Sequence, residues 1–400
     1  MFFANDFRYA LRLLMKRPAF TALTVSVMAA GIGLSVYLFS FMYSANFKPL
    51  PFEDGESLVS VSGSRNGSRN FRALNLHDFE EIRRSVDGLD ELTAYTNATF
   101  NVEGRDGARR YRGVRAEPNL FELSRIEPQL GRAFTAAENA SGAERVVVIG
   151  YDVWQNAYAG ASDVLGRTVR INGDSHRVIG VMPAGYYFPE TADMWVPLRD
   201  SASNTTRDEA PSVYGLAHLN GEIPVKQINE QLASTMRRLE ERYPESNNRI
   251  SAYADTLQMS NTGDGITVVY SMMVAAVLIL VLASVNVGNL LLARAIERGK
   301  ETAIRTALGA PRLRLISQMV WESLIICVLG GVIGILLVAW GLEVTETTTS
   351  NFFGDRPSFW WKFGIDGYTL QIFGMFLLGT VLLTGVLPAW RNSGGDFNAV

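Results

Sequence analysis

The chain has 400 residues, enough for two or three domains, and 48% of them are hydrophobic while only 19% are charged. A formal net charge of −3 gives no indication of a nucleic-acid-binding protein. The single cysteine, Cys327, excludes an intrachain disulfide and a cysteine metal cluster. The histidines His77, His176 and His218 show no ligand-like spacing, so no metal site is predicted.

The first 18 residues have the pattern of a short amphipathic helix. Apolar residues recur along one side, at Phe3, Phe7, Leu11 and Leu14. A basic row lies beside them at i, i+4 spacing, at Arg8, Arg12 and Lys16. Such a helix lies in the cytoplasmic membrane interface, with its cations toward anionic lipid headgroups. A charge cluster that only sets the topology of the chain explains the pattern equally well.

Four apolar blocks predict an α-helical membrane protein with four transmembrane helices. Residues 19–45 contain no charged residue, and a bilayer core needs about 20 helical residues. Three further blocks have comparable length and composition: 266–293, 315–342 and 367–390. Buried helices of a soluble protein are the alternative, but they rarely stay uncharged for this length. The first block is also much longer than the apolar run of a signal peptide, about 7–15 residues, which favours an uncleaved anchor.

The charges that flank these blocks predict their orientation. Basic residues dominate before the first block and again between residues 294 and 314, which contain six basic and two acidic residues. Because cytoplasmic loops are enriched in Lys and Arg, both chain ends and the 294–314 loop are expected in the cytoplasm, including the tail 391–400. Segments 46–265 and 343–366 are then expected on the outer side of the membrane.

Residues 46–265 are long enough to form a domain with its own core. Strands rich in β-branched residues are predicted at 58–62, 145–149, 168–171 and 176–181, and Asn172-Gly173 is a typical hairpin turn. Helices are predicted at 75–85, 151–158 and 225–243. The fold class is therefore four transmembrane helices plus a mixed α+β extracytoplasmic domain inserted between the first and second helices.

The loop 294–314 contains a Gly-Lys pair at Gly299-Lys300. A phosphate-binding loop needs Gly-x-x-x-x-Gly-Lys followed by Ser or Thr, because backbone amides and the lysine surround the phosphates. Here Arg294 replaces the first glycine and Glu301 the hydroxyl residue, so the motif is not present. A cytoplasmic helix from about Arg294 to Leu308 is expected instead, with Gly309 as its C-cap. A charged loop without a partner is the alternative.

The spans contain small residues and one carboxylate. Small residues let transmembrane helices approach closely, and they occur at Gly31, Gly33, Gly330 and Gly334. Glycine that is merely tolerated is an equally simple explanation. Glu322 lies near the start of the third span, where a carboxylate generally needs a partner. Pairing with a loop arginine is favoured over proton relay.

The residues from Asn286 to Gly334 resemble the signature of the MacB/FtsX-type permeases of ABC transporters. In that family a similar R-x-x-E-x-x-x-R-x-A-L-G-A sequence, here Arg298 to Ala310, joins the second and third spans. The segment ERVVVIGYDVWQNAYAG, which starts at Glu144, resembles part of the family's MacB-like periplasmic core domain. The segment LPAWRNSGGDF resembles the family's sequence at the exit from the fourth span. The resemblance covers essentially the whole chain and is closest to permeases that carry the four-span unit twice, of which one unit is expected here.

The resemblance implies a mechanism in which ATPase movement is transmitted to the periplasmic domain without a continuous pore. It implies a separate cytoplasmic ABC ATPase subunit, which supplies the ATP and Mg sites, with no cofactor bound directly by this chain. A second permease unit is implied, as a homodimer or linked homologous half, with a periplasmic adaptor as a further candidate partner alongside membrane lipids. A porter-like part (47–100 and 216–260) would enclose an inserted subdomain (101–215). The residues expected to dock the ATPase are Glu297, Arg298, Glu301, Ile304, Arg305, Leu308 and Gly309.

Three functions are compatible with these residues. The first is a permease subunit that exports or extracts a peptide, drug or lipoprotein. The second is an FtsX-like interaction protein that transmits ATPase motion to a periplasmic enzyme. The third, a membrane-anchored enzyme, is disfavoured because the sequence shows no nucleophile–base pairing. The large mixed domain favours the first.

Overall fold

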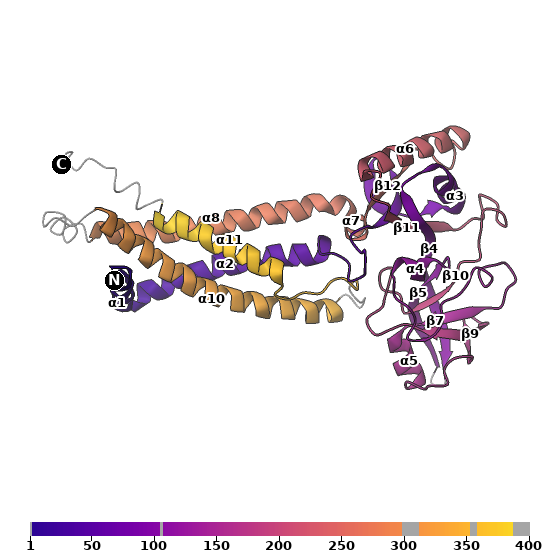
Figure 1. Cartoon of the computed structure of the whole chain (residues 1–400), viewed down its shortest axis with the longest axis horizontal. Helices are drawn as coiled ribbons and strands as arrows, with labels where there is room; N and C mark the ends of the chain where they lie inside the picture. The colour runs from indigo at the N-terminus through magenta and orange to yellow at the C-terminus, as the bar shows by residue number, and fades with distance from the viewer. Residues whose placement is uncertain (1, 105–106, 298–311, 353–357, 387–400) are drawn as a thin grey trace. The chain divides into compact units, whose positions relative to one another are not determined.

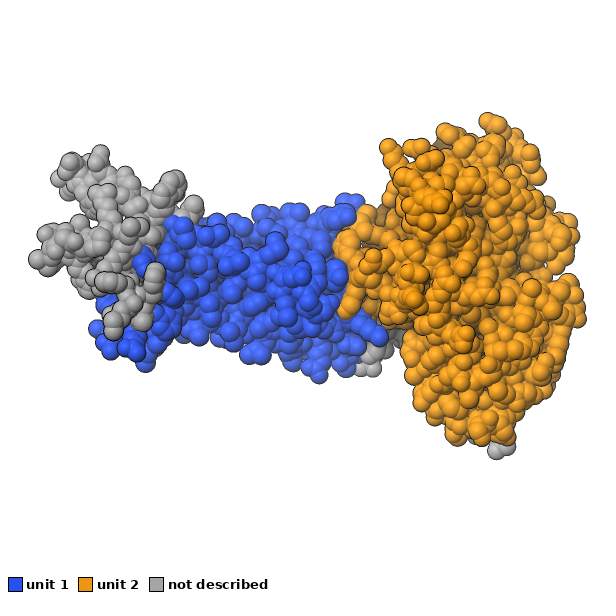
Figure 2. All heavy atoms as spheres, viewed as in Figure 1, with its two compact units in different colours: residues 1–44, 267–352, 362–400 blue, residues 45–266, 353–361 orange. Residues whose placement is uncertain are grey.

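The computed structural model describes residues 2–104, 107–297, 312–352 and 358–386. The chain divides into two compact units, coloured separately in Figure 2. Residues 1–44, 267–352 and 362–400 form the helical unit, and residues 45–266 with 353–361 form the sheet unit. Each unit is described by itself.

The helical unit is a bundle of long apolar helices (Figure 1). Its elements are α1 (Phe2–Met15), α2 (Pro18–Asn46), α8 (Ile266–Glu297), α10 (Arg312–Phe352) and α11 (Gly367–Val381), which a π-helical turn, η2 (Leu382–Val386), continues. Four helices in the described part of the chain are long and apolar enough to cross a membrane: Pro18–Asn46, Leu257–Glu297, Val320–Thr349 and Gly367–Val386. The predicted number of spans is confirmed.

The outer faces of these helices explain why the bundle needs a membrane. α8 carries apolar side chains around its whole circumference, and Leu278 and Leu282 are each 62% exposed. A helix that is apolar on all sides is stable only when protein or lipid covers it. Its inner side is built from small or medium residues such as Ala276, Ala283 and Val287, which are buried. The inward face therefore packs on neighbouring helices, and the outward face suits lipid.

Two helices extend beyond the spans expected from the sequence. α8 continues to Glu297, so Arg294, where a cytoplasmic helix was expected to begin, belongs to the last turn of α8. α10 continues to Phe352, through ten residues that were expected to belong to the loop 343–366. Charge changes along the chain located the apolar cores but not the helix ends, because a helix continues through polar residues once its apolar part is packed.

The sheet unit contains one long mixed sheet in the order β12-β1-β11-β4-β5-β10-β7-β9-β6. β10 pairs in parallel with β5, and β7 with β9, whereas the other pairings are antiparallel. The strands are β1 (Leu58–Arg65), β2 (Ser68–Arg72), β3 (Leu74–Asn75), β4 (Leu89–Gly104), β5 (Gly107–Ala116), β6 (Leu130–Gly131), β7 (Val146–Ile149), β8 (Thr168–Ile171), β9 (Asp174–Val181), β10 (Met194–Pro197), β11 (Ser212–Leu219) and β12 (Ile250–Thr256). The predicted mixed domain between the first and second spans is confirmed.

Local sequence signals account for several of these elements. Asn172 (φ 53°) and Gly173 (φ 88°) both adopt the left-handed conformation, as the two-residue hairpin turn between β8 and β9 requires. The helix α6 (Val225–Arg242) follows Pro224 and buries an i, i+4 stripe against the sheet: Ile228, Leu232, Met236 and Leu239. In α3 (Leu76–Ser85) the side chain of Asn75 accepts a hydrogen bond from the His77 amide and caps the helix.

The remaining short helices of the sheet unit are α4 (Leu120–Leu123), α5 (Tyr151–Tyr158), α7 (Leu257–Thr262) and the 3-10 turn η1 (Gly263–Gly265). Among the described residues, separate apolar clusters lie along the sheet. One, beneath α3 and α6, draws on residues between Val59 and Ala254, and another, near α5, draws on residues between Phe100 and Val196. The 16-residue strand β4 runs through both regions. The boundaries expected for a porter-like part and an inserted subdomain stay a prediction.

Candidate functional site

Arg294 forms the centre of a buried cluster at the end of α8. Its side chain is 4% exposed, and its Nη1 lies 3.9 Å from Oε2 of Glu322 on α10. Its Nη2 donates a hydrogen bond of 2.9 Å to the carbonyl oxygen of Leu13, in the last turn of α1. The guanidinium also lies over the ring of Phe20 on α2, 4.7 Å from the ring centroid. One side chain therefore contacts three other helices.

The chemistry of a guanidinium suits this position. Its planar face stacks on an aromatic ring while an N–H at its edge donates to a carbonyl, a combination that an ammonium group achieves less well. The carbonyls at the end of α1 carry the negative end of the helix dipole, so a cation is stabilised there. Glu322 is also largely buried, at 13% side-chain exposure, and each charge offsets part of the other's desolvation cost. The structure thus gives Glu322 an arginine partner, from α8 itself.

A second ion pair lies one turn further along α8. Glu297 accepts a hydrogen bond of 3.2 Å from Arg17, and both side chains are 64% exposed. Exposed pairs of this kind contribute little stability. Glu297 is the one predicted docking residue that the structure describes. The other six lie outside the described residues: Arg298, Glu301, Ile304, Arg305, Leu308 and Gly309.

The N-terminal helix packs on the bundle and exposes one face. The ring of Phe7 contacts that of Trp321 on α10 edge to face, at 5.6 Å between centroids, and Ala10 and Leu14 are buried. Leu14, expected on the lipid-facing side, therefore faces protein. Leu11 and Met15 remain exposed beside the exposed basic row. That outer face keeps the composition of an interfacial helix.

The four glycines predicted to pack helices lie where α2 contacts its neighbours. A Cβ atom on Gly31 would lie 2.4 Å from the Cβ of Ala283 on α8. On α10, a Cβ on Gly330 would lie 2.7 Å from the Cβ of Met28, and Gly334 faces the backbone of Gly33. Ser35 adds a hydrogen bond of 2.7 Å to the carbonyl of Ala276. The Gly330–Gly334 pair thus serves a helix contact within this chain.

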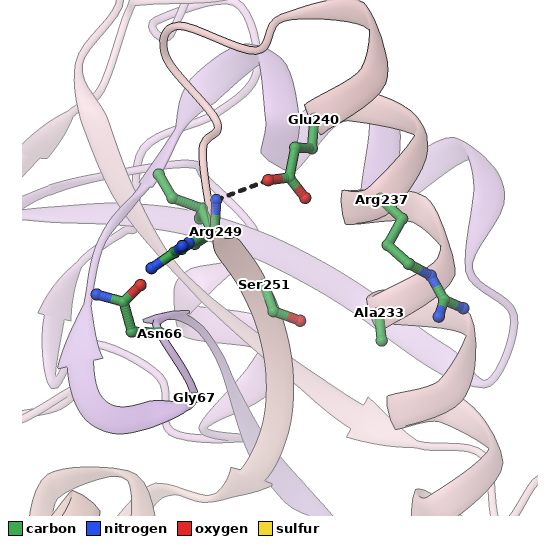
Figure 3. Close-up of a pocket in the computed structure, with 8 residues that line it drawn as sticks. Asn66, Gly67, Ala233, Arg237, Glu240, Arg249 and Ser251 are labelled. Carbon is green, nitrogen blue, oxygen red and sulfur yellow. Dashed lines mark hydrogen bonds between the residues drawn. The ribbon is translucent and has the colours of Figure 1, made fainter.

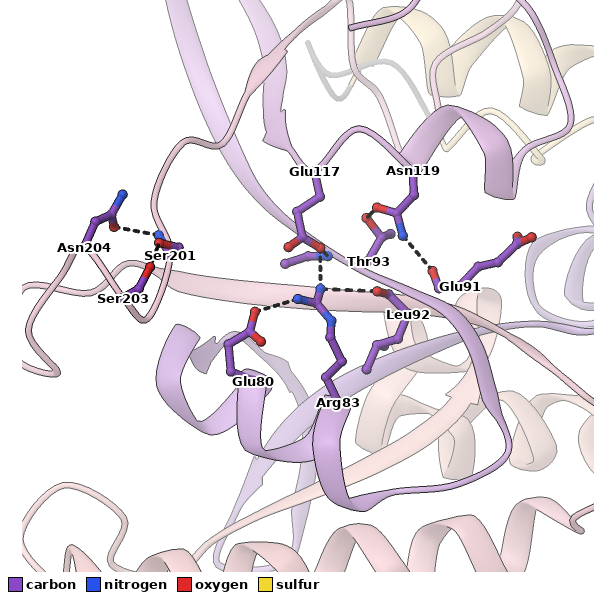
Figure 4. A network of polar contacts seen from close by, with 11 residues as sticks. Glu80, Arg83, Glu91, Leu92, Thr93, Glu117, Asn119, Ser201, Ser203 and Asn204 are labelled. Atoms are coloured by element: carbon purple, nitrogen blue, oxygen red, sulfur yellow. Dashed lines mark hydrogen bonds and ion pairs between the residues drawn. The ribbon is translucent and has the colours of Figure 1, made fainter. Parts of the chain in front are cut away.

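A polar network ties α3 to the sheet (Figure 4). Arg83 on α3 donates to Glu80 at 2.5 Å, to the carbonyl of Leu92 at 3.2 Å and to Glu117. Glu117 also accepts from the amide of Ala94 on β4, at 2.7 Å. The arginine thereby links the helix to two segments of the sheet. Each of these Arg83 contacts is made to a protein acceptor, so we interpret the network as one that holds α3 on the sheet.

The sheet unit has a shallow pocket of about 490 Å³ beside α6 and β12 (Figure 3). Arg237, Glu240 and Arg249 line it, and Glu240 accepts a hydrogen bond of 2.8 Å from the Arg249 amide. Among the described residues, no three His, Cys, Asp or Glu side chains gather as a metal site. Each of the three histidines forms a hydrogen bond with a different backbone carbonyl. His77 pairs with Thr205, His176 with Asp174 and His218 with Leu123.

Two features of the bundle and its connections were not predicted from the sequence. The helix expected from about Arg294 is at its start a continuation of α8, and the burial of the Arg294 side chain was not predicted. The segment 358–361 was treated as part of a plain loop, although it contains three consecutive aromatic residues: Phe359, Trp360 and Trp361. Consecutive aromatic residues in a connection are a signal of burial, because exposing them to water is unfavourable.

Comparison with known proteins agrees with this architecture. Residues 21–235 match the MacB-like periplasmic core domain, and residues 273–395 match the FtsX-like permease C-terminal domain. The probable export ATP-binding/permease protein MacB of Pseudomonas entomophila is 26% identical over 260 residues, which cover 62% of this chain and 38% of that protein. The macrolide export ATP-binding/permease protein MacB of Bdellovibrio bacteriovorus is 24% identical over 381 residues, which cover 89% and 55%. The chain spans about half the length, or less, of these curated relatives.

Among solved structures, the periplasmic region of MacB from Actinobacillus actinomycetemcomitans is 15% identical, with a TM-score of 0.39, and the match covers 54% of this chain and 92% of that one. Four helices long and apolar enough to cross a membrane, with a mixed α/β domain after the first, are typical of a multi-pass membrane protein, and the family matches place it in the permease class. The chain belongs to the MacB/FtsX-type permeases of ABC transporters. The predicted family is confirmed.

Proposed function

We propose that this permease transmits movement from a separate cytoplasmic ATPase to its periplasmic domain, and that this movement exports or extracts a substrate. The supporting observation is the cluster around Arg294. α8 is one continuous helix from Ile266 to Glu297, and Arg294 joins its end to α1, α2 and α10. A force applied at the end of α8 would therefore act on several helices together.

The ATPase would dock on the segment that follows α8. Ile304 and Leu308 are proposed as apolar anchors and Glu297, Arg298, Glu301 and Arg305 as the polar rim, with Gly309 ending the helix. ATP and Mg would bind to the ATPase. The names of two relatives include macrolide export and syringafactin export. A drug or a peptide is the proposed class of substrate.

The proposed setting is a bacterial inner membrane, with both chain ends in the cytoplasm. Two ATPases close against paired docking segments, so a second permease unit is proposed, as an identical copy or a linked homologous half. A periplasmic adaptor would receive the substrate. The match to the MacB-like periplasmic core domain favours this function over regulation of a periplasmic enzyme.

Substitution of one anchor tests the docking proposal. Leu308→Asp should abolish capture of the cognate ATPase, because a central apolar anchor typically contributes about 2–4 kcal/mol to an interface. Arg298→Ala should weaken capture modestly and make it more sensitive to salt, as for a rim charge. Pull-down from detergent measures both, and membrane insertion of each variant is the control. Capture by Leu308→Asp at the level of the unsubstituted chain would contradict the proposal.

A further inference from the structure

The connection between α10 and α11 contains a segment that is part of the sheet unit. Residues 358–361, which we call the aromatic tether, pack with the core of residues 45–266. Trp360 is 2% exposed and belongs to the same apolar cluster as Leu50, Phe188 and Trp195. Connections between helices usually run over the surface, so the burial of this one indicates specific packing against the sheet unit.

Specific contacts hold the aromatic tether in place. The ring of Phe359 lies 5.2 Å from that of Phe52 and 6.1 Å from that of Phe188, and those two rings lie 5.3 Å apart. These distances are those of favourable edge-to-face and tilted aromatic pairs. Two hydrogen bonds fix the orientation of the segment. The Phe359 amide donates to the Glu190 carbonyl at 3.3 Å, and the Trp360 indole donates to the Ala45 carbonyl at 3.4 Å.

The lengths of chain on either side make this attachment short. Five residues separate Phe352, the end of α10, from Ser358, and five separate Trp361 from Gly367, the start of α11. The six chain steps across each such gap span at most roughly 22 Å. A large displacement of either helix end would therefore pull on the aromatic tether.

We propose that the aromatic tether is a third attachment of the periplasmic domain, in addition to its covalent continuity with α2 and α8. Through it, movement of α10 and α11 reaches the core around Phe52 and Phe188. This inference rests on the proposed mechanical function. It adds a path into the sheet core that does not run through the covalent continuity with α2 or α8.

Hydrogen exchange on the full chain in nanodiscs tests whether the tether is held. Phe52→Ala removes a ring that packs on Phe359 without changing the tether itself. Hydrogen exchange of the 358–361 amides should then become about tenfold faster. Phe134→Ala is the matched control, because Phe134 belongs to the same cluster but its ring contacts that of Phe121. Equal exchange in Phe52→Ala and the unsubstituted chain, or equal acceleration in both variants, would overturn the attachment.

Spin labels on exposed Glu241 of α6 and Thr348 of α10, in a Cys327→Ser background, then follow ATP-dependent movement with the ATPase bound. We expect the ATP-dependent distance change to be reduced in Phe52→Ala and retained in Phe134→Ala. A full change in Phe52→Ala, with its tether released, would overturn the transmission role. If the unsubstituted chain shows no change, the proposed function fails, while the exchange result still decides whether the tether is attached.

Discussion

At the scale of single residues, Arg294 is a buried charge that contacts three other helices. It is buried against α1, α2 and α10, and its carboxylate partner is largely buried. Removing one member of a buried ion pair leaves the other charge without compensation, whereas replacing both by apolar residues is often tolerated. A single substitution that destabilises the protein much more than the double substitution therefore indicates that the ion pair contributes to stability.

Glu322→Ala should therefore lower the stability of the helical unit by about 3 kcal/mol. The double variant Arg294→Met with Glu322→Leu should recover most of that loss. Arg17→Ala is the control, since its exposed pair with Glu297 should contribute less than about 1 kcal/mol. Thermal unfolding in detergent measures all three. Equal effects of Glu322→Ala and Arg17→Ala would show that the Arg294 pair has no special role.

A second residue-scale prediction concerns acid stability of the sheet unit. Hydrogen bonds from Arg132, and from the amide and hydroxyl of Thr135, lower the pKa of Glu138 from 4.5 to about 2. A carboxyl whose pKa is depressed on folding stabilises the folded state above its unfolded pKa, and loses that contribution as pH falls through the folded pKa. Glu138→Gln should flatten the pH dependence of unfolding between about pH 4.5 and 2. An unchanged profile, measured by circular dichroism, would count against the assignment.

At the scale of elements, the contacts of α2 depend on residues without side chains. Gly31→Ala should destabilise the bundle by about 1–3 kcal/mol, because the new Cβ would overlap Ala283 unless the helices move apart. Gly374→Ala on α11 is the matched control, since a Cβ there meets no atom within 4 Å. Alanine also favours helix over glycine by about 1 kcal/mol, so the control should be neutral or stabilising. Loss of thermal stability in both variants alike would contradict the packing assignment.

Elements that depend on local signals could be predicted from the sequence, and those that depend on distant partners could not. The four spans follow from uninterrupted apolar runs, and the β8–β9 turn follows from Asn172-Gly173. α6 follows from its apolar stripe between two prolines. The pairing of β1 with both β11 and β12, about 155 and 195 residues away, has no local signal. The packing site of the aromatic tether is formed by Phe52 and Phe188, which are distant in sequence. The pairing of Glu322 with Arg294 likewise depends on how far α8 extends.

At the scale of the whole molecule, the proposed function requires that an event at the docking segment moves the periplasmic domain. α8 offers one path, through the Arg294 cluster, and the aromatic tether offers another. Both paths consist of packed or covalent connections, as transmission of movement requires. Family membership establishes the class of protein, and movement is the part of the proposal that must be measured.

The most direct measurement is the distance between spin labels at Glu241 and Thr348 in the full chain, reconstituted with its ATPase, with and without ATP. Transmission predicts a distance distribution that shifts on addition of ATP in the unsubstituted chain and stays fixed in Leu308→Asp, where docking is lost. A distribution that does not respond to ATP in the unsubstituted chain, despite ATPase binding and hydrolysis, would contradict the account. So would an undiminished shift in Leu308→Asp.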